Sequence, residues 1–267
     1  MKRLHFYKYQ GTGNDFIMIN QLEAAVLDGS ETALIKRLCD RRFGIGADGL
    51  ILLQPKEGYD FEMDYFNADG RRGSMCGNGA RCTVAFARSL GLEQSGYYFF
   101  APDGPHRARL SPEKEGWVEI EMSDVQEVEH GQGYFFMDTG SPHYVRFDEK
   151  LEDLNVEKEG RQIRYNERFA AAGTNVNFAS AAPDFPLQVC TYERGVEAET
   201  LSCGTGVTAA AIAYTLQHQL TLKAAISIPV KTKGGLLEVR MEKKEEKYCK
   251  IWLCGPAKEV FQGHLYI

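Results

Sequence analysis

The sequence predicts an α+β protein of two pseudo-symmetric domains, each a curved, mostly antiparallel sheet wrapped around a central helix. Two observations lead to this expectation. Each half of the chain runs through strands, a Cys-Gly-x-Gly turn, a helix of small residues and further strands. The two turns, at 75–79 and 202–206, lie 127 residues apart, about half of the 267-residue chain. We interpret this order as an internal duplication, with one domain over 1–127 and the other over 128–255.

Composition and charge fit an ordinary globular protein longer than one average domain. The chain is 43% apolar and 25% charged, with a formal net charge of −6. No apolar run approaches the roughly 20 residues that cross a bilayer, and the first ten residues place charges where a signal peptide has its apolar stretch. No basic cluster is longer than the Arg pairs at 41–42 and 71–72. We therefore expect no secretion, no membrane insertion and no nucleic-acid partner.

The seven cysteines are an odd number, so at least one thiol of a monomer stays free. They are Cys39, Cys76, Cys82, Cys190, Cys203, Cys249 and Cys254. The sequence has no Cys-x-x-Cys, no His-x-x-x-His and no Asn-x-Ser/Thr sequon. These absences argue against a zinc site and a thioredoxin-like motif, so we expect no bound metal and a reducing, cytoplasmic location.

The residue pattern of the first half predicts several strands and two helices. Short apolar stretches indicate strands at 5–9, 16–19, 50–53 and 61–66. Ser30 is expected to cap a helix whose apolar face is Ala33, Leu34 and Leu38. Small residues then favour a buried helix over 77–90, and alternation from 97 to about 128, as in 117–122, indicates several strands.

The second half repeats this plan after a polar stretch at 123–133. A strand at 134–137 leads into a turn at 140–142. The segment 204–216 is predicted to be an Ala-rich helix opened by glycines. Further strands are expected at 175–178, 187–192, 224–230, 236–241 and 249–254.

The segment Gly44–Gly49 matches G-x-G-x-x-G, the dinucleotide-binding fingerprint. That fingerprint requires a strand before the glycines and a helix after them. Here a predicted helix precedes them and an apolar strand follows. We interpret the segment as a helix-to-strand turn and expect no nicotinamide cofactor.

Cys76 and Cys203 each precede Gly-x-Gly at the predicted start of a helix. Unpaired backbone N–H groups and the helix dipole stabilise anions there, so a thiol at this place ionises more easily. A free cysteine more often simply fills a core, and we prefer that reading for the other five. For Cys76 and Cys203 the interpretation as core residues is less convincing, because the same arrangement occurs twice.

Two such helix starts facing each other across a domain interface would suit inversion of a carbon next to a carboxylate. One thiolate would remove the α-proton and the opposing thiol would deliver a proton to the other face. The N–H groups would hold the carboxylate as negative charge develops on it.

Other side chains in turn-like settings are candidates for assisting such a site. His143 and Glu193 would tune the thiols, although each alone is more often an ordinary hydrogen-bonding residue. Arg194 offers a planar fork for a carboxylate, with a surface ion pair as the plainer reading. The neutral candidates are Asn14, Asn67 and Asn175, with the alternative that Asn is simply favoured in turns.

Eight sequence blocks resemble those of the diaminopimelate epimerase family over nearly the whole chain. They are Gly11–Phe16, Gly44–Gly49, Phe66–Gly70, Cys76–Cys82, Gly140–His143, Gly173–Asn177, Tyr192–Gly195 and Cys203–Gly206. The resemblance implies cofactor-independent inversion of LL- to meso-diaminopimelate, on the route to lysine and peptidoglycan. It also implies a homodimer in which residues 256–267, around Phe261, return to the first domain.

The resemblance implies a role for each candidate residue. Cys76 and Cys203 are the two acid/base thiols, assisted by His143 and Glu193. The reacting carboxylate is bound at the helix starts by Gly77, Asn78, Gly204 and Thr205. The distal end of the amino acid is held by Asn14, Asn67, Asn175 and Arg194, and Glu193 is also expected to contact substrate.

Two positions depart from the family pattern. Many members carry Gln where this chain has Gly49 and Asn where it has Ser141, and both positions usually contact substrate. A racemase of another amino acid is therefore the main alternative. A thiol redox enzyme that pairs Cys76 with Cys203, and a non-enzymatic binding module, are less favoured.

Overall fold

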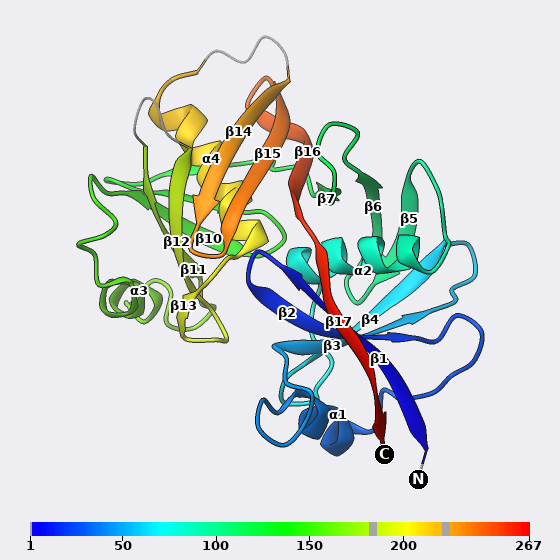
Figure 1. The fold of residues 1–267 in the computed structure, drawn as a ribbon. Helices are drawn as coiled ribbons and strands as arrows, with labels where there is room; N and C mark the ends of the chain where they lie inside the picture. The colour runs from blue at the N-terminus through cyan, green and yellow to red at the C-terminus, as the bar shows by residue number, and fades with distance from the viewer. Residues whose placement is uncertain (1, 182–185, 221–224) are drawn as a thin grey trace. The chain divides into compact units, whose positions relative to one another are not determined.

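The computed structural model describes residues 2–181, 186–220 and 225–267 of the chain (Figure 1). The chain divides into two compact units. Unit 1 comprises residues 1–120 and 255–267, and unit 2 comprises residues 121–254. The division at 120/121 differs by seven residues from the predicted boundary. Among the described residues, no helix is both long and apolar enough to cross a membrane.

Unit 1 is a sheet of eight strands with two helices. Its strands are β1 (Arg3–Gly11), β2 (Asn14–Asn20), β3 (Gly49–Gln54), β4 (Phe61–Asn67), β5 (Tyr97–Ala101), β6 (Gly104–Leu110), β7 (Trp117–Met122, which ends in unit 2) and β17 (Lys258–Tyr266). They pair in the order β17-β1-β2-β3-β4-β5-β6-β7. Among the described strands of this unit, only β2/β3 and β4/β5 pair in parallel. The helices are α1 (Thr32–Cys39), between β2 and β3, and α2 (Gly77–Ser89), between β4 and β5.

Unit 2 repeats this topology strand for strand. Its strands are β8 (Glu129–His130), β9 (Phe135–Asp138), β10 (Pro142–Phe147), β11 (Asn175–Ser180), β12 (Leu187–Glu193), β13 (Ala198–Thr200), β14 (Ile226–Thr232), β15 (Gly235–Lys244) and β16 (Lys247–Pro256, which ends in unit 1). The order is β8-β9-β10-β11-β12-β14-β15-β16, with β13 added to β12. The parallel pairs β10/β11 and β12/β14 take the same places as in unit 1.

The helices of unit 2 also repeat those of unit 1. Helix α3 (Val156–Arg164) lies between β10 and β11, and α4 (Gly204–Gln217) lies between β12 and β14. This correspondence of strand order, strand direction and helix position confirms the predicted fold class and the internal duplication.

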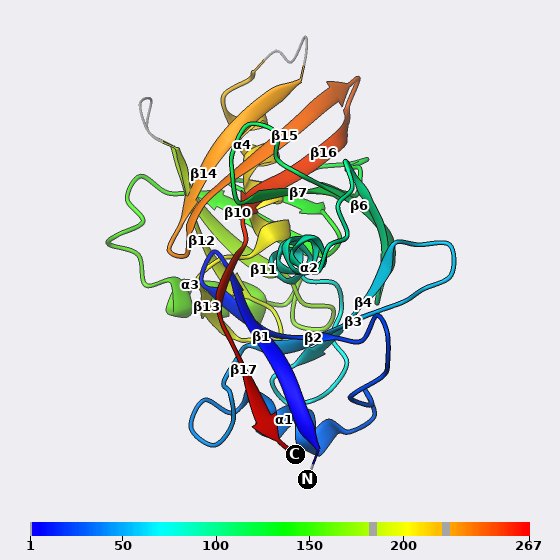
Figure 2. The ribbon, with the colours of Figure 1, turned by 45° about the vertical axis from the view of Figure 1, so that its right-hand side comes forward.

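The central helices α2 and α4 are buried along most of their length. Figure 2 views α2 nearly end-on, with strands of unit 1 curving around it. Ten residues of α2 and ten of α4 are buried, most of them Gly, Ala, Thr, Cys or Val. Small side chains let a sheet approach a helix from several sides, which is why a helix with little polar face is stable here.

The predicted elements largely match the structure. The helices expected at 77–90 and 204–216 end within one residue of α2 and α4, and each strand expected among the described residues overlaps an observed one. Residue 224, the first of the strand expected at 224–230, lies outside the described residues. The segment Gly44–Gly49 does connect a helix to a strand, as predicted.

One local expectation needs correction, and two elements were not predicted. Ser30 does not cap α1, because Asp28 organises the preceding turn: its carboxylate accepts from the Ser30 backbone N–H at 2.8 Å. The residue before α1 is Glu31, whose side chain forms no cap hydrogen bond. Helix α3 was not predicted because its sequence is mostly charged, although Asn155, which caps it by accepting from Lys158, is a recognisable signal. Strand β10 was also not predicted.

Candidate active site

Cys76 and Cys203 hold the same place in the two units. Each is the residue before a central helix, with φ −119° and ψ 117° for Cys76 and φ −117° and ψ 113° for Cys203. Neither side chain caps its helix, and neither takes part in a disulfide. Each half-site therefore places a free thiol beside the first turn of a buried helix.

The helix starts themselves are suited to a carboxylate. The first intrahelical bonds run from Ala80 N to Cys76 O and from Val207 N to Cys203 O. The N–H groups of the preceding positions, which include Gly77 and Gly204, have no partner within the helix. Neither helix has an acidic residue in its first turn, whereas the surface helix α3 has two. The positive ends of α2 and α4 are thus not neutralised by an acidic residue of their own first turns, which suits them to an anionic ligand.

In unit 1, the thiol faces a carbonyl oxygen. Asn14 begins β2, and its Nδ2 donates to Asp48 Oδ2 at 2.6 Å. This bond turns Asn14 Oδ1 toward the helix start, where it lies 3.6 Å from Cys76 Sγ and accepts from Asn78 Nδ2 at 3.3 Å. The predicted residues Asn14, Cys76 and Asn78 therefore belong to one hydrogen-bonded group.

A cluster of charges supports Asn14 from behind. Arg41 donates to both oxygens of Asp15, at 2.9 and 2.7 Å, and to Asp48 at 2.7 Å. Lys8 forms an ion pair with Asp15 at 2.7 Å. Partial burial alone would raise the pKa of Asp15, but the hydrogen bonds from Arg41 and Lys8 hold it well below its usual range. Asp48 is thereby kept in position to accept from Asn14.

Arg81 is a buried cation that the sequence analysis did not single out. It is 0% exposed, and its guanidinium donates to Asn78 Oδ1 at 2.8 Å and to Thr12 Oγ1 at 3.1 Å. With Oδ1 facing Arg81, the Asn78 amide nitrogen points to Asn14. Arg81 follows Cys76 in the same motif block, and a charged residue inside an otherwise small-residue helix was a usable signal.

Asn67 and Gly49 lie together on the strands beside β2, where Gly49 pairs with Phe16. Asn67 ends β4 directly opposite Gly49 of β3. A Cβ atom at Gly49 would lie only 2.5 Å from Tyr65 Cε2 and 2.6 Å from the Phe66 carbonyl oxygen. The Tyr65 ring therefore occupies the space that a side chain at position 49 would need.

In unit 2, His143 is a neutral, fully buried ring. It is 0% exposed, its Nδ1 lies 3.0 Å from Asn177 Nδ2, and its Nε2 lies 3.0 Å from Ser141 Oγ. Burial, and secondarily the charge of Arg194, lowers the pKa of His143 to about 3. The ring is therefore uncharged near neutral pH.

Asn175 and Arg194 form a second predicted pair. The Arg194 backbone N–H donates to Asn175 Oδ1 at 2.9 Å, and the Arg194 guanidinium donates to the Ala172 carbonyl oxygen at 3.1 Å. Gly173 lets Arg194 approach, because a Cβ there would lie 2.6 Å from Arg194 Cδ. Glu193 ends β12 immediately before Arg194.

Ser141 and Thr205 connect these residues to the second thiol. Ser141 Oγ lies 3.4 Å from Thr205 Oγ1, which lies 3.4 Å from Cys203 Sγ. Thr139 Oγ1 holds the Thr205 carbonyl oxygen at 2.9 Å. The buried supports Asn177 and Thr191 were not predicted. The Asn-Val-Asn spacing at 175–177, which puts two amides on one face of a strand, was the available signal.

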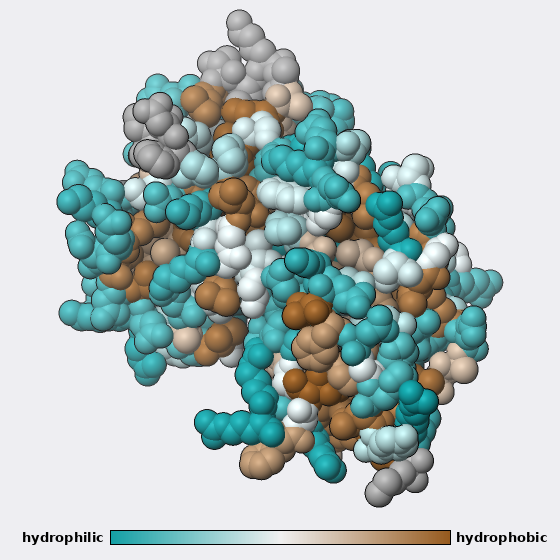
Figure 3. Space-filling view, viewed as in Figure 1, coloured by the Kyte–Doolittle hydropathy of each residue, from teal (hydrophilic) through white to brown (hydrophobic). Residues whose placement is uncertain are grey.

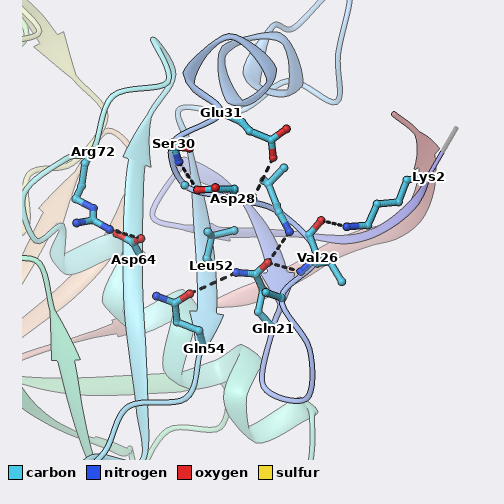
Figure 4. A pocket seen from close by; sticks show the side chains of 13 residues that line it. Lys2, Gln21, Val26, Asp28, Ser30, Glu31, Leu52, Gln54, Asp64 and Arg72 are labelled. Carbon is cyan, nitrogen blue, oxygen red and sulfur yellow. Dashed lines mark hydrogen bonds and ion pairs between the residues drawn. The ribbon is translucent and has the colours of Figure 1, made fainter.

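A separate pocket of unit 1 shares no residue with either group (Figure 4). It is lined by residues that include Gln21, Asp28, Asp64 and Arg72. Gln21 Oε1 accepts from the backbone N–H groups of residues 26 and 27, and Arg72 donates to Asp64 at 2.7 Å. These polar groups bond to neighbours within the unit, so the pocket carries no sign of a ligand.

Comparison with known proteins places this geometry in context. A family model described as "Diaminopimelate epimerase" matches residues 6–128 and 135–260. A diaminopimelate epimerase of Flavobacterium psychrophilum is 45% identical over 97% of this chain and 99% of the relative. One of Chlorobaculum tepidum is 40% identical over 95% and 98%, respectively.

Two solved structures share the fold at low sequence identity. A phenazine biosynthesis protein of the PhzF family from Bacillus anthracis matches with a TM-score of 0.76 and 14% identity over 100% of both chains. A probable proline racemase from Agrobacterium radiobacter K84 matches with a TM-score of 0.68 and 13% identity, over 99% of this chain and 93% of the other. At these identities the likeness concerns the fold alone.

Proposed function

This chain belongs to the diaminopimelate epimerase family and is an isomerase, and we propose that it inverts the α-carbon of diaminopimelate with Cys76 and Cys203 as its two acid/base groups. The observation that carries the proposal is the repeated helix start. Two thiols, each on a residue with nearly the same backbone torsions, precede two helices whose first N–H groups have no partner within the helix.

The reaction follows from the chemistry of these groups. A thiolate from one unit removes the α-proton, and the thiol from the other unit delivers a proton to the opposite face of the same carbon. The proton count is unchanged after each turnover, with thiol and thiolate exchanged. Gly77, Asn78, Gly204 and Thr205 hold the carboxylate through their backbone N–H groups while negative charge develops on it. No cofactor is needed for this transfer.

We assign the distal amino-acid end of the substrate to Asn14, Asn67, Asn175 and Arg194. The side chains support this assignment. The Arg194 guanidinium can donate to a carboxylate, and the amide oxygens of the asparagines can accept from an ammonium group. His143 and Glu193 assist from unit 2. Because His143 is neutral, its part is to donate or accept hydrogen bonds and not to supply charge.

The cellular setting is part of the same proposal. We assign the enzyme to the cytoplasm, in the supply of lysine and peptidoglycan precursors, because its thiols must stay reduced to work. We also propose a homodimer. Strand β17 exposes the apolar side chains Val260, Phe261 and Tyr266. Apolar surface also lies over the part of unit 1 where β17 runs (Figure 3). Exposed apolar surface of this kind supports a contact with a second copy of the chain. Light scattering of the purified protein tests the dimer.

A racemase of another amino acid is the second candidate. The observation in its favour is that Tyr65 fills the space at Gly49, and that Ser141 is shorter than the Asn common in the family. Rates on LL-diaminopimelate and on amino acids with a single carboxylate separate the two. Faster inversion of a single-carboxylate amino acid would overturn the first assignment.

The deciding experiment is α-proton exchange in deuterated water under reducing conditions, without pyridoxal phosphate. Wild-type protein should incorporate deuterium at the α-carbon of LL-diaminopimelate and form the meso isomer. Cys76→Ala and Cys203→Ala should each lower the inversion rate by about 10²–10⁴-fold or more.

Cys249→Ala is the matched control, since Cys249 is a half-buried cysteine of β16. It should keep the wild-type rate. Inversion that survives either of the first two changes would contradict the two-thiol reaction. Turnover only under oxidising conditions would favour a redox enzyme.

A further inference from the structure

Arg164, the last residue of α3, is a largely buried cation to which the proposed reaction gives no role. Its side chain is 13% exposed, and its guanidinium carbon lies 4.7 Å from the centre of the Tyr165 ring. Its Nε atom is buried and forms no hydrogen bond with any described residue. Withdrawing a charged group from solvent in this way costs free energy, so the place of Arg164 in the fold calls for an explanation.

The loop over residues 165–174, which connects α3 to β11, is one of two segments that Arg164 contacts. Arg164 Nη1 donates to the Phe169 carbonyl oxygen at 3.3 Å, and the same oxygen accepts from the Gly173 backbone N–H at 2.8 Å. Gly173 has a φ of +78°, and a Cβ atom there would lie 2.9 Å from Arg164 Cζ. Arg164 therefore packs against the loop just before Asn175 begins β11.

The turn over residues 194–197, between β12 and β13, is the second segment. Arg164 Nε lies 3.5 Å from Glu197 Oε1, and this oxygen also accepts from the Gly195 backbone N–H at 3.1 Å. Glu197 Oε2 accepts from the Tyr192 hydroxyl at 3.1 Å. Glu197 has a φ of +60°, which a residue with a side chain keeps only where its surroundings hold it. The Glu197 carboxylate thus fixes the turn, and Arg164 is one of its partners.

The loop and the turn meet at Asn175 and Arg194. The Arg194 backbone N–H donates to Asn175 Oδ1 at 2.9 Å, and the Arg194 guanidinium donates to the Ala172 carbonyl oxygen at 3.1 Å. A Cβ atom at Gly173 would lie 2.6 Å from Arg194 Cδ as well as 2.9 Å from Arg164 Cζ, so both arginines pack against the same glycine. Arg164 therefore joins the two segments whose meeting orients Asn175 and Arg194.

We propose that Arg164 is a positioning residue that holds Arg194 and Asn175 in place for the distal end of the substrate. The inference rests on the proposed assignment of those two residues to the distal end, and adds a residue that acts through them. Two guanidinium groups this close repel, and the Glu197 carboxylate beside Arg164 offsets that repulsion. The second positive charge also makes the surroundings of Arg194 more favourable for a carboxylate.

The first test needs no substrate and follows hydrogen exchange of single backbone amides by NMR. Arg164→Met keeps much of the apolar length of the side chain but removes its charge and its donors. The protection factor of the Arg194 amide should fall about three- to tenfold, the range that one hydrogen bond contributes. The Val207 amide, which donates to the Cys203 carbonyl oxygen at the start of α4, should keep its protection.

The second test is the kinetics of LL-diaminopimelate inversion. Arg164→Met should raise KM about tenfold and change kcat by less than about threefold, because the distal residues bind substrate but do not transfer the proton. Arg164→Lys keeps a positive charge but lacks the planar fork that reaches both Phe169 and Glu197. Its KM should lie between those of the wild type and Arg164→Met.

Arg161→Met is the matched control. Arg161 lies three residues earlier in α3, with its guanidinium carbon 5.3 Å from the centre of the same Tyr165 ring. It should leave the Arg194 amide and KM unchanged. If Arg164→Met folds poorly, Glu197→Gln removes the opposite charge at nearly constant shape, and should lower the protection of the Arg194 amide by a smaller amount.

An Arg194 amide that keeps its protection in both Arg164→Met and Glu197→Gln would overturn the proposal. Equal effects in Arg161→Met would do so too, because they would indicate general loosening of α3, and so would a fall in kcat at constant KM. Hydrogen exchange is read without substrate. A wild-type protein that does not invert diaminopimelate would therefore refute the proposed function, while a loosened Arg194 amide in Arg164→Met would still support the positioning of Arg194.

Discussion

The two half-sites differ at the second residue after each cysteine. This residue is Asn78 in α2, after Cys76, and Thr205 in α4, after Cys203. In unit 1 the neighbouring turn supplies Asn14, at the start of β2, and in unit 2 it supplies Ser141, just before β10. The same backbone thus presents a carbonyl oxygen to one thiol and a hydroxyl group to the other.

The groups that support these contacts differ in charge. Arg81 is a permanent cation beneath the first half-site, and His143 is a neutral ring beneath the second. Strand order and helix position have been retained in both units, because the sheet around each helix depends on them. Polar side chains at the helix starts depend less on the fold and have diverged, so the two thiols have different neighbours.

The largest expected difference between the half-sites concerns the glycine three residues after each cysteine. A Cβ atom at Gly206 would lie 2.3 Å from Asn177 Oδ1, in an amide held by its bonds to Tyr144, His143 and Thr191. Gly206→Ala should therefore cost about 2–4 kcal/mol of unfolding free energy, measured by urea denaturation.

Gly79→Ala is the matched change in unit 1. Its Cβ would meet the ends of the Ile51 and Met63 side chains at 3.1 Å, and these can shift. Because Ala also favours the helix, the cost should stay within about 1 kcal/mol. Equal destabilisation by the two changes would show that the helices are packed alike and would break the comparison.

A second difference, smaller than the first at mildly acidic pH, is expected on acidification. The pKa of His143 is about 3 in the folded protein and about 6.5 in an unfolded chain, so below pH 6.5 only the unfolded state takes up this proton. The stability contribution is complete above pH 6.5 and is lost as the pH falls toward 3, at up to about 1.4 kcal/mol per pH unit. The protection factors of the α4 amides, measured by hydrogen exchange and corrected for the intrinsic pH dependence of exchange, should fall over this range.

The α2 amides and a variant serve as controls for this effect. Arg81 keeps its charge over the whole range, so the protection of α2 should change less until the stability contribution of Asp15 begins to be lost below about pH 4, where the carboxyl of the unfolded chain takes up a proton. His143→Gln should flatten the response of α4. A response that is the same in both helices would exclude His143 as its source.

The smallest effect is expected from the charge cluster of unit 1. The Arg41 side chain is 57% exposed, so solvent screens its ion pairs and their worth to stability is small. Arg41→Gln should leave the unfolding free energy within about 1 kcal/mol but lower kcat/KM for diaminopimelate a few-fold, because Asp48 no longer holds Asn14 firmly.

Arg168→Gln is the matched control, since Arg168 forms a similar exposed pair with Glu129 in unit 2. It should leave kcat/KM unchanged. Loss of activity in both variants would point to a general electrostatic effect, and loss in neither would remove the charge cluster from the support of Asn14.

Much of the fold could be predicted because local pattern and tertiary role agree. The small-residue helices at 77–89 and 204–217 are marked by glycines at their starts and by few side chains too large for close packing. Helix α3 and strand β10 were missed, since the first is mostly charged and the second follows a Gly-Ser-Pro turn that obscures its alternation. Their formation depends on packing, as where Gly160 of α3 lies against Tyr192.

The sequence by itself determined the duplication, the two cysteines before two helices, and the type of reaction that such a pair suits. These are properties of spacing and of residue chemistry, which are written along the chain. Only the tertiary structure decided that Asn14 offers its oxygen to Cys76, that His143 is neutral, and that Thr205 lies between Ser141 and Cys203. Those features depend on which atoms of distant segments meet, and on the burial and the fixed backbone donors and acceptors that surround them.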